Sequence, residues 1–476
     1  MSLGRVDARF LLPFAPERAA VLAGAEGWRE GLTQAGVDTE GEDPELVVAA
    51  SEELAPAGAM RARALLFEGN RTRAPAGYHA RRFVPLPSLE RPSLLVPVDR
   101  GNVAGYVFEN WLFPTTRARL VRKRLLVSLA RPALALLRRP SITIATTTQA
   151  QPFLVAAAAE RFALDPDADW FVVCGQGDEL SRGLFVLFAR HARRPSWVVK
   201  FSRARGYSEP FERDEAALET VAAAGGAVAQ RAPSFLGRFE AAGFQASIET
   251  AAVGSRLTGL LQSVAPRSKK LSAIDAVAAW LVRVGIETEG GTGSAAAEAE
   301  RLRREVLPKW EIVADEGVLD EIDTLPGVLQ HNDLGAWNVV VDRDGDFTAV
   351  DWESASACGL PLWDLWYFLA DALVQLDGYA DDQVSAFARL FQGEARSSQV
   401  LFRWTRAAVD ALGIPEHVVG CLATLCWLHH GLSGSTRADS LARHAGGAAS
   451  TAWAAEAYPG AWLGEAALGF GWSRWR

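Results

Sequence analysis

Apolar and polar positions change their spacing along the chain. Over the first 150 residues, a helical pattern at Pro16–Gly36 is followed by short apolar runs that are typical of strands. This alternation predicts a small α/β domain over residues 1–150. The strand-like runs are Leu46–Ala50, Ala62–Phe67, Arg82–Leu86 and Leu94–Val98.

A second pattern begins near residue 151. After an expected helix at Pro152–Phe162, three apolar runs predict consecutive strands, and a helical run follows at Glu212–Ala224. Beyond Pro266 the spacing is mostly helical. The sequence therefore predicts a β-rich part at 151–255 and a helical part at 256–476. The three expected strands are Trp170–Cys174, Leu184–Ala189 and Trp197–Phe201.

Composition and charge narrow the class of protein. The 476 residues are 49% apolar and 22% charged, which is ordinary for a globular chain of two or three domains. The net charge of −8 conceals a division, since residues 1–150 carry 20 basic against 15 acidic residues (+5). The remainder carries 29 against 42 (−13). This acidity argues against nucleic acid as a partner.

No targeting or membrane-spanning segment is evident in the sequence. The first residues lack the apolar core of a secretory signal, and the longest apolar stretch, Leu125–Leu137, is interrupted by Arg131 and Pro132. The four cysteines are too few and too unevenly spaced for a disulfide framework or a zinc site, so reduced thiols are expected. These features predict a cytoplasmic protein.

One basic segment contrasts with the net negative charge of the chain. Arg117–Arg139 contains eight Lys and Arg residues and no acidic residue, with apolar residues between them. Such a stretch suits weak contact with an anionic membrane surface or with a partner protein. The alternative is a surface helix that packs its leucine face on its own domain, and Pro132 favours this alternative because it breaks a long helix.

The strongest chemical signal lies at Leu329–Asp364. Two strand-like runs, Asn338–Val341 and Phe347–Val350, flank a turn that contains Asp-Gly, which is a hairpin signal. The hairpin brings Asn338 close to Asp351. Oxygen donors of this kind suit Mg²⁺, which is commonly held by one or two protein groups together with phosphates.

A third polar group completes the arrangement. Asp333 lies five residues before Asn338 in a predicted loop. With Asn338 and Asp351 assigned to the metal, Asp333 is placed to orient a substrate hydroxyl and to accept its proton.

These residues resemble the catalytic loop and metal-binding segment shared by protein kinases and the aminoglycoside phosphotransferase-like family. The matching elements are His331-x-Asp333-x4-Asn338 and Asp351-Trp352-Glu353. The tryptophan, the lack of a following glycine and the later Gly359-Leu360-Pro361-x2-Asp364 favour the small-molecule kinase branch. The resemblance implies an α+β, two-lobed protein-kinase-like fold, with its N-lobe in 151–255 and its C-lobe in 256–476.

The same resemblance implies a nucleotide site in the N-lobe. It assigns Lys200 to the α- and β-phosphates and Glu215 to the lysine as its ion-pair partner, with Glu219 as the second candidate. Gly175 and Gly177 stand where a phosphate loop belongs, although the full glycine spacing of protein kinases is absent.

The function implied is transfer of the γ-phosphoryl group of ATP or GTP, with Mg²⁺, to a hydroxyl of a small acceptor such as an aminoglycoside, a sugar or an amino alcohol. The −13 charge of residues 151–476 favours a cationic acceptor. Two alternatives stay open. The basic segment 117–139 suggests a membrane-surface kinase that acts on a lipid-linked saccharide, and a nucleotide-binding pseudokinase scaffold is the non-enzymatic alternative. The complete set of expected site residues argues against the scaffold.

Overall fold

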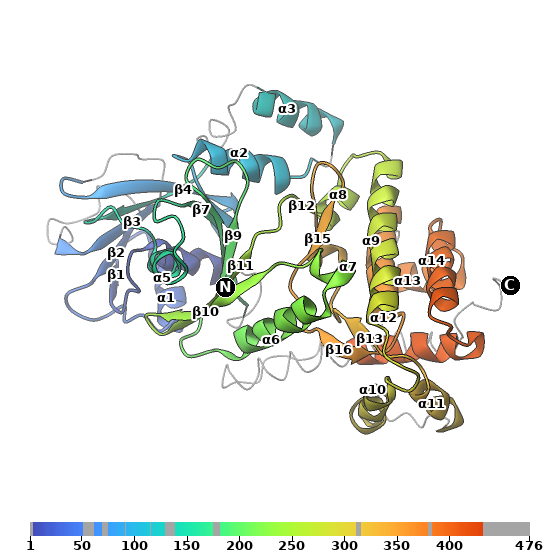
Figure 1. The fold of residues 1–476 in the computed structure, drawn as a ribbon. Helices are drawn as coiled ribbons and strands as arrows, with labels where there is room; N and C mark the ends of the chain where they lie inside the picture. Colours follow the sequence, from blue (N-terminus) through green and yellow to red (C-terminus); the bar gives the residue numbers. More distant parts are fainter. Residues whose placement is uncertain are drawn as a thin grey trace. The chain divides into compact units, whose positions relative to one another are not determined.

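The computed structural model describes most of the chain, and its contacts divide the chain into two compact units (Figure 1). The first unit comprises Met1–Glu215 and Ser234–Val253, and the second comprises Ala216–Pro233 and Gly254–Arg476. The described residues are 3–50, 61–68, 75–90, 92–114, 116–128, 139–174, 181–310, 316–378 and 383–431.

The first unit is built on one sheet, which has eleven strands among the described residues. The strands are β1 (Ala19–Val21), β2 (Leu46–Ala49), β3 (Ala64–Glu68), β4 (His79–Pro87), β5 (Pro92–Pro97), β6 (Ile142–Thr146), β7 (Asp169–Val173), β8 (Gly183–Phe188), β9 (Trp197–Phe201), β10 (Phe235–Ala241) and β11 (Phe244–Thr250). Their order is β1-β2-β3-β6-β4-β5-β7-β8-β9-β11-β10. The β1–β2 and β2–β3 pairs are parallel, and the remaining neighbouring pairs are antiparallel.

The strands of the N-terminal segment and the strands that follow residue 168 belong to the same sheet. Strand β5 pairs with β7, with Leu94 opposite Val173, and the amide of Cys174 donates to the carbonyl of Ser93 at 2.9 Å. A single sheet therefore spans the predicted N-terminal domain and the predicted N-lobe. The division of the chain at residues 150 and 255 stays a prediction.

Helices cover both faces of this sheet (Figure 1). On the central strands successive side chains enter different cores, since Trp170 and Val172 belong to one buried cluster and Phe171 to the other. This two-sided burial explains why these strands are continuous apolar runs. The helices of the unit are η1 (Leu3–Leu11), η2 (Glu26–Trp28), α1 (Arg29–Gln34), α2 (Gly101–Asn110), α3 (Arg117–Ser128), α5 (Phe153–Phe162) and the first part of α6 (Glu209–Ala224).

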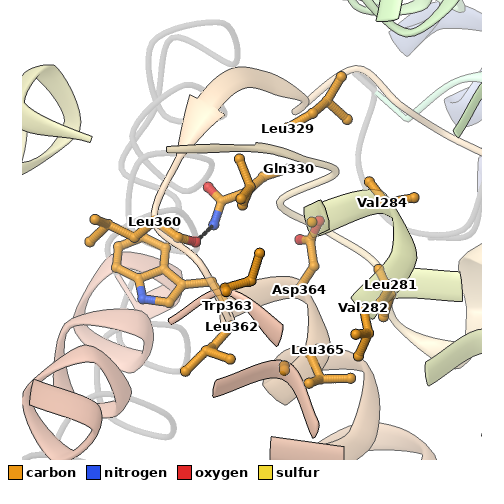
Figure 2. Close-up of a pocket in the computed structure, with 14 residues that line it drawn as sticks. Leu281, Val282, Val284, Leu329, Gln330, Leu360, Leu362, Trp363, Asp364 and Leu365 are labelled. Atoms are coloured by element: carbon orange, nitrogen blue, oxygen red, sulfur yellow. Dashed lines mark hydrogen bonds between the residues drawn. The ribbon is translucent and has the colours of Figure 1, made fainter. Parts of the chain in front are cut away.

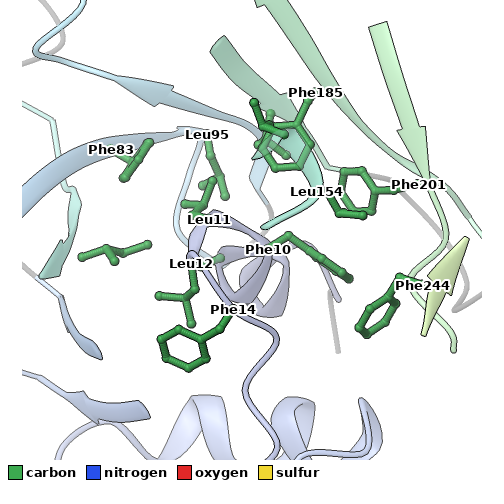
Figure 3. Close-up of a cluster of buried hydrophobic side chains, with 14 of the residues drawn as sticks. Phe10, Leu11, Leu12, Phe14, Phe83, Leu95, Leu154, Phe185, Phe201 and Phe244 are labelled. Carbon is green, nitrogen blue, oxygen red and sulfur yellow. The ribbon is translucent and has the colours of Figure 1, made fainter. Parts of the chain in front are cut away.

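The N-terminal turn η1 is part of the core beside β9 and β11. The ring of Phe10 lies 4.6 Å from that of Phe201 and 5.1 Å from that of Phe244, measured between centroids (Figure 3). Nearby, Asp7 forms a buried ion pair with Arg203. Packing and charge thus join the first residues of the chain to the loop that follows β9.

The structure bears on two further expectations from the sequence. The helix expected at 16–36 is wrong, because this segment forms β1, η2 and the short α1. Its first part joins the sheet instead, because β1 pairs in parallel with the fully buried β2. The basic segment 117–139 begins as α3, as expected for a helix, but its residues 129–138 lie outside the described residues.

The second unit is mostly helical. Its small strands are β12 (Ser255–Arg256), β13 (Val328–Gln330), β14 (Val339–Val341), β15 (Phe347–Ala349) and β16 (Ser356–Gly359). Its helices are α7 (Gly226–Ala229), α8 (Leu257–Gln262), α9 (Arg267–Thr288), α10 (Ala296–Arg301), η5 (Leu302–Val306), η6 (Leu307–Trp310), α11 (Glu316–Asp323), η7 (Ala336–Asn338), α12 (Trp363–Asp377), α13 (Gln383–Gln392), α14 (Ser398–Ala411) and η8 (Glu416–Val418), followed by helical residues 419–431.

Helix α12 lies at the centre of this second unit. It packs against α8, α9, α13 and α14, and twelve of its fifteen residues are buried, which matches its nearly continuous apolar sequence. A sheet-based unit followed by a helical unit confirms the predicted α+β class. None of the helices in the described part of the chain is both long and apolar enough to cross a bilayer.

The packing of η1 makes a testable prediction about stability. Because the Phe10 side chain is fully buried, Phe10→Ala should lower the free energy of unfolding by roughly 3–5 kcal/mol. Val121 is 56% exposed, so Val121→Ala is the matched control and should change it by less than about 0.5 kcal/mol. Urea unfolding followed by tryptophan fluorescence measures both. Equal effects of the two substitutions would show that η1 is not part of the core.

Candidate active site

The hairpin predicted at 338–350 is present and brings two expected site residues together. Strands β14 and β15 pair in antiparallel register, and within the turn Asp342 accepts hydrogen bonds from the amides of Asp344 and Asp346. Past the end of β15, the amide of Val350 donates to the carbonyl of Asn338 at 2.8 Å. Asp351 therefore follows directly after a residue that is bonded to Asn338.

Asn338 also orients the catalytic-base candidate. Its Nδ2 donates to the carbonyl oxygen of Asp333 at 2.9 Å and to Oδ2 of the Asp333 carboxylate at 3.1 Å. With the amide nitrogen used in this way, the Oδ1 atom of Asn338 is the atom available to a cation. The structure thus brings Asp333, Asn338 and Asp351 to one place, as the sequence predicts.

The His331 ring forms hydrogen bonds that hold the loop around Asp333 in place. Its Nδ1 accepts a hydrogen bond from the amide of Asp333 at 3.3 Å, so the ring proton resides on Nε2, which donates to the carbonyl of Val350 at 3.0 Å. The ring also packs on Trp352 with 4.5 Å between centroids. The histidine therefore ties the loop to the segment that carries Asp351, which is a structural role.

One face of α12 holds the loop at several points. Asp364 accepts hydrogen bonds from the amides of His331 at 2.5 Å and Asn332 at 2.9 Å, and about two turns later Asp371 accepts from the amide of Ala336 at 2.8 Å. Between them Tyr367 donates its hydroxyl to Oδ1 of Asp333 at 3.3 Å. These three positions, spaced i, i+3 and i+7, share one side of the helix.

Asp364 lies against a small apolar cavity of about 30 Å³ inside the second unit (Figure 2). Leu281, Val284 and Leu365 are among its lining side chains, together with Gln330, whose Nε2 donates to the carbonyl of Leu360. Burial raises the pKa of Asp364 to about 6, and the two loop amides oppose this rise. The volume is that of about one water molecule, so this cavity is not a substrate site.

The Asp333 carboxyl is tuned by its surroundings. Burial is the main cause that raises its pKa to about 7, and the negative charges of Asp351 and Glu353 raise it as well. The hydrogen bonds from Tyr367 and Asn338 act in the opposite direction. A carboxyl group with a pKa near neutrality is suited to accept a proton from a hydroxyl and to release it again.

A basic residue that the sequence did not reveal lies near Asp351. Arg256 ends the short strand β12, where it pairs with Val340 of β14. Burial lowers the pKa of its guanidinium, and the negative charge of the Asp351 carboxylate acts in the opposite direction. Only the pairing of β12 with β14 brings Arg256 here, so no local motif could have identified it.

Lys200 lies in the first unit and is buried, as its position in the apolar strand β9 predicts. Its Nζ contacts both carboxylate oxygens of Asp214, at 3.0 and 2.9 Å, and Oε2 of Glu249 at 2.9 Å. Two carboxylates therefore compensate the burial of one ammonium.

The structure pairs Lys200 with Asp214 instead of with the expected Glu215. Glu215 accepts a hydrogen bond from Arg238 Nε at 2.6 Å at the edge of the unit, while Asp214 takes the lysine. The reason is helical phase, because the buried positions of α6 include Phe211, Leu218 and Val221, and residue 214 falls on their face of the helix. The second candidate, Glu219, is exposed. The spacing of apolar residues could have identified Asp214 from the sequence.

The remaining expected nucleotide contacts, Gly175 and Gly177, lie outside the described residues. Among the residues that are described, no group of three or more His, Cys, Asp and Glu side chains is arranged for a metal ion. The pair Asn338 and Asp351 offers two oxygen ligands, and this donor set fits Mg²⁺ when phosphate oxygens supply further ligands.

Comparison with known proteins gives the family that this part of the chain resembles. Residues 184–407 match the profile of the phosphotransferase enzyme family, and this range contains Lys200, Asp333, Asn338 and Asp351. The resemblance inferred from the motifs is confirmed over this range. A search of the curated protein sequences finds no relative of the chain.

Three solved structures are similar to this chain. An aminoglycoside-3'-phosphotransferase of type VIII is 17% identical, with 54% of this chain and 97% of that chain covered and a TM-score of 0.31. LicA in complex with AMP is 14% identical, with 66% and 97% covered and a TM-score of 0.35. Choline kinase LicA from Streptococcus pneumoniae is 15% identical, with 54% and 97% covered and a TM-score of 0.26.

The surroundings of Asp333 predict a measurable proton affinity. In the metal-free protein, an NMR titration of its carboxyl carbon should give a pKa of about 7. Asp351→Asn should lower the pKa because it removes one nearby negative charge. Asp344→Asn at the hairpin tip is the control and should leave the pKa unchanged. An ordinary aspartate pKa in the wild type, or no response to Asp351→Asn, would contradict this account.

Proposed function

We propose that this protein is a small-molecule kinase that transfers the γ-phosphoryl group of ATP or GTP to a hydroxyl group of a small acceptor. The observation that carries the proposal is the convergence of Asp333, Asn338 and Asp351 within a segment that matches the phosphotransferase enzyme family. The aminoglycoside phosphotransferase and the choline kinase among the similar structures support a small acceptor as the substrate class.

Each residue has a role in this proposal. Asp333 holds the acceptor hydroxyl through a carboxylate oxygen and takes its proton as the phosphoryl group is transferred. Asn338 keeps that carboxylate in a fixed rotation through its Nδ2. Lys200 binds the nucleotide phosphates, and Asp214 and Glu249 hold the lysine.

Asn338 and Asp351 would bind Mg²⁺, which when bound neutralises phosphate charge and orients the phosphates for in-line transfer. Their oxygen donors fit this ion. Catalysis of this type comes from positioning and electrostatic stabilisation, which require rigid support of the loop. Helix α12 supplies that support through Asp364 and Asp371.

The role of Asp333 gives the first test. Asp333→Asn keeps the size of the side chain but removes the base, so turnover should fall by roughly 10²–10⁴-fold while nucleotide binding persists. The measurement is ADP release over a panel of aminoglycosides, sugars and amino alcohols, with titration calorimetry for the nucleotide. Asp344→Asn, at an exposed carboxylate of the same hairpin, is the control. Wild-type turnover in Asp333→Asn would contradict the proposal.

The metal role gives the second test and separates an enzyme from a nucleotide-binding scaffold. Calorimetric titration of the wild type with ATP should show tighter binding in Mg²⁺ than in EDTA, because Asn338 and Asp351 would hold the ion and the ion would neutralise phosphate charge. Asp351→Asn should remove this difference. Nucleotide binding that does not depend on metal, together with no turnover on any acceptor, would favour the scaffold.

A further inference from the structure

A second buried cation lies beside Lys200. Arg182 directly precedes β8, and the register of β8 with β9 sets Gly183 opposite Phe201 and Leu184 opposite Lys200. Directly opposed residues share a face of the sheet, and side chains alternate between the faces along a strand. Arg182 and Lys200 therefore project from the same face.

Glycine at position 183 allows this close pairing. A Cβ atom built there would lie 2.2 Å from Cζ of Phe201, because the phenylalanine ring covers the glycine on the other face of the sheet. Phe201 in turn belongs to the buried cluster that contains Phe10. The strand that begins after Arg182 is thus fixed by packing on the face opposite to the charges.

The cation also interacts with the same carboxylate as Lys200. Nη1 of Arg182 lies 3.8 Å from Oδ2 of Asp214, whose side chain is fully buried, and the Arg182 side chain is only 11% exposed. Lys200 contacts Asp214 and Glu249 at 2.9 Å each. Two cations and two carboxylates form one buried set.

Binding of an anion here requires positive charge beside the carboxylates. Among the described contacts, Lys200 lies between Asp214 and Glu249, and Arg182 adds a second positive charge next to Asp214. A planar guanidinium also offers two parallel donors to phosphate oxygens, which an ammonium lacks.

We propose that Arg182 is a second phosphate-binding cation of the nucleotide site, which acts beside Lys200. This inference rests on the proposed kinase function and extends it to a residue outside the motifs. The competing explanation is that Arg182 only holds Asp214 in place for Lys200.

The test is the dependence of affinity on phosphate. Arg182→Met keeps the length of the side chain and removes its charge, and calorimetry compares MgATP, MgADP and adenosine. Binding of MgATP should weaken by roughly 10- to 100-fold, MgADP by less, and adenosine should be unaffected. Arg182→Lys should recover part of the loss. Arg190→Met, at an exposed arginine just past the other end of β8, is the control.

A double-mutant cycle with Asp214→Asn separates the two explanations. If Arg182 binds phosphate, Arg182→Met weakens MgATP further in the Asp214→Asn background; if it only holds Asp214, no further loss occurs and the inference is overturned. Equal losses for adenosine and MgATP would overturn it as well. Failure of the wild type to bind MgATP would overturn the kinase function itself, whereas wild-type binding with an unaffected Arg182→Met would overturn only the role of Arg182.

Discussion

The geometry of the candidate site depends on buried carboxylates of one helix that accept hydrogen bonds from loop amides. Without a partner, a buried carboxylate is strongly unfavourable, and so is a buried amide. The carboxylates of Asp364 and Asp371 accept hydrogen bonds from the amides at the two ends of the loop 331–336. Each of these bonds gives a partner both to a loop amide and to a carboxylate of the helix. Because α12 is packed on several sides, the loop that carries Asp333 inherits the rigidity of the core. A helix 30 residues later in the sequence therefore determines where the catalytic-base candidate stands.

A comparable dependence links Lys200 to the N-terminal part of the chain. Strand β5 covers the edge of β7 that would otherwise be open, which removes an exposed sheet edge. On the face opposite to Lys200, the ring of Phe10 packs against Phe201. The first hundred residues thus contribute structure to the strands around the nucleotide-site candidate, and this contribution follows from packing alone, whatever other role the segment has.

The sequence predicts the site best where the determinants are local. The turn with Asp-Gly fixes the hairpin, and the hairpin brings Asn338 to Asp351. Residues whose position depends on distant pairing escaped prediction: Tyr367 reaches Asp333 from α12, and Arg256 reaches Asp351 through the β12–β14 pair. The choice of Asp214 as the lysine partner is an intermediate case, since it follows from helical phase rather than from a motif. The continuous sheet could not be predicted, because the apolar pattern of a segment indicates a strand but does not indicate which other strand it pairs with.

The residues around Lys200 and the residues around Asp333 differ in their charges, and each group suits a different ligand. Around Lys200, the side chains of Lys200 and Arg182 place two positive charges next to the carboxylates of Asp214 and Glu249. Around Asp333 the carboxylates of Asp351 and Glu353 reinforce one another, which raises the affinity of Asp333 for a proton. A cluster of carboxylates attracts cations and protons, whereas adjacent cations that carry N–H donors suit phosphate. Phosphoryl transfer to a hydroxyl needs both properties, and in this chain each comes from a separate set of residues.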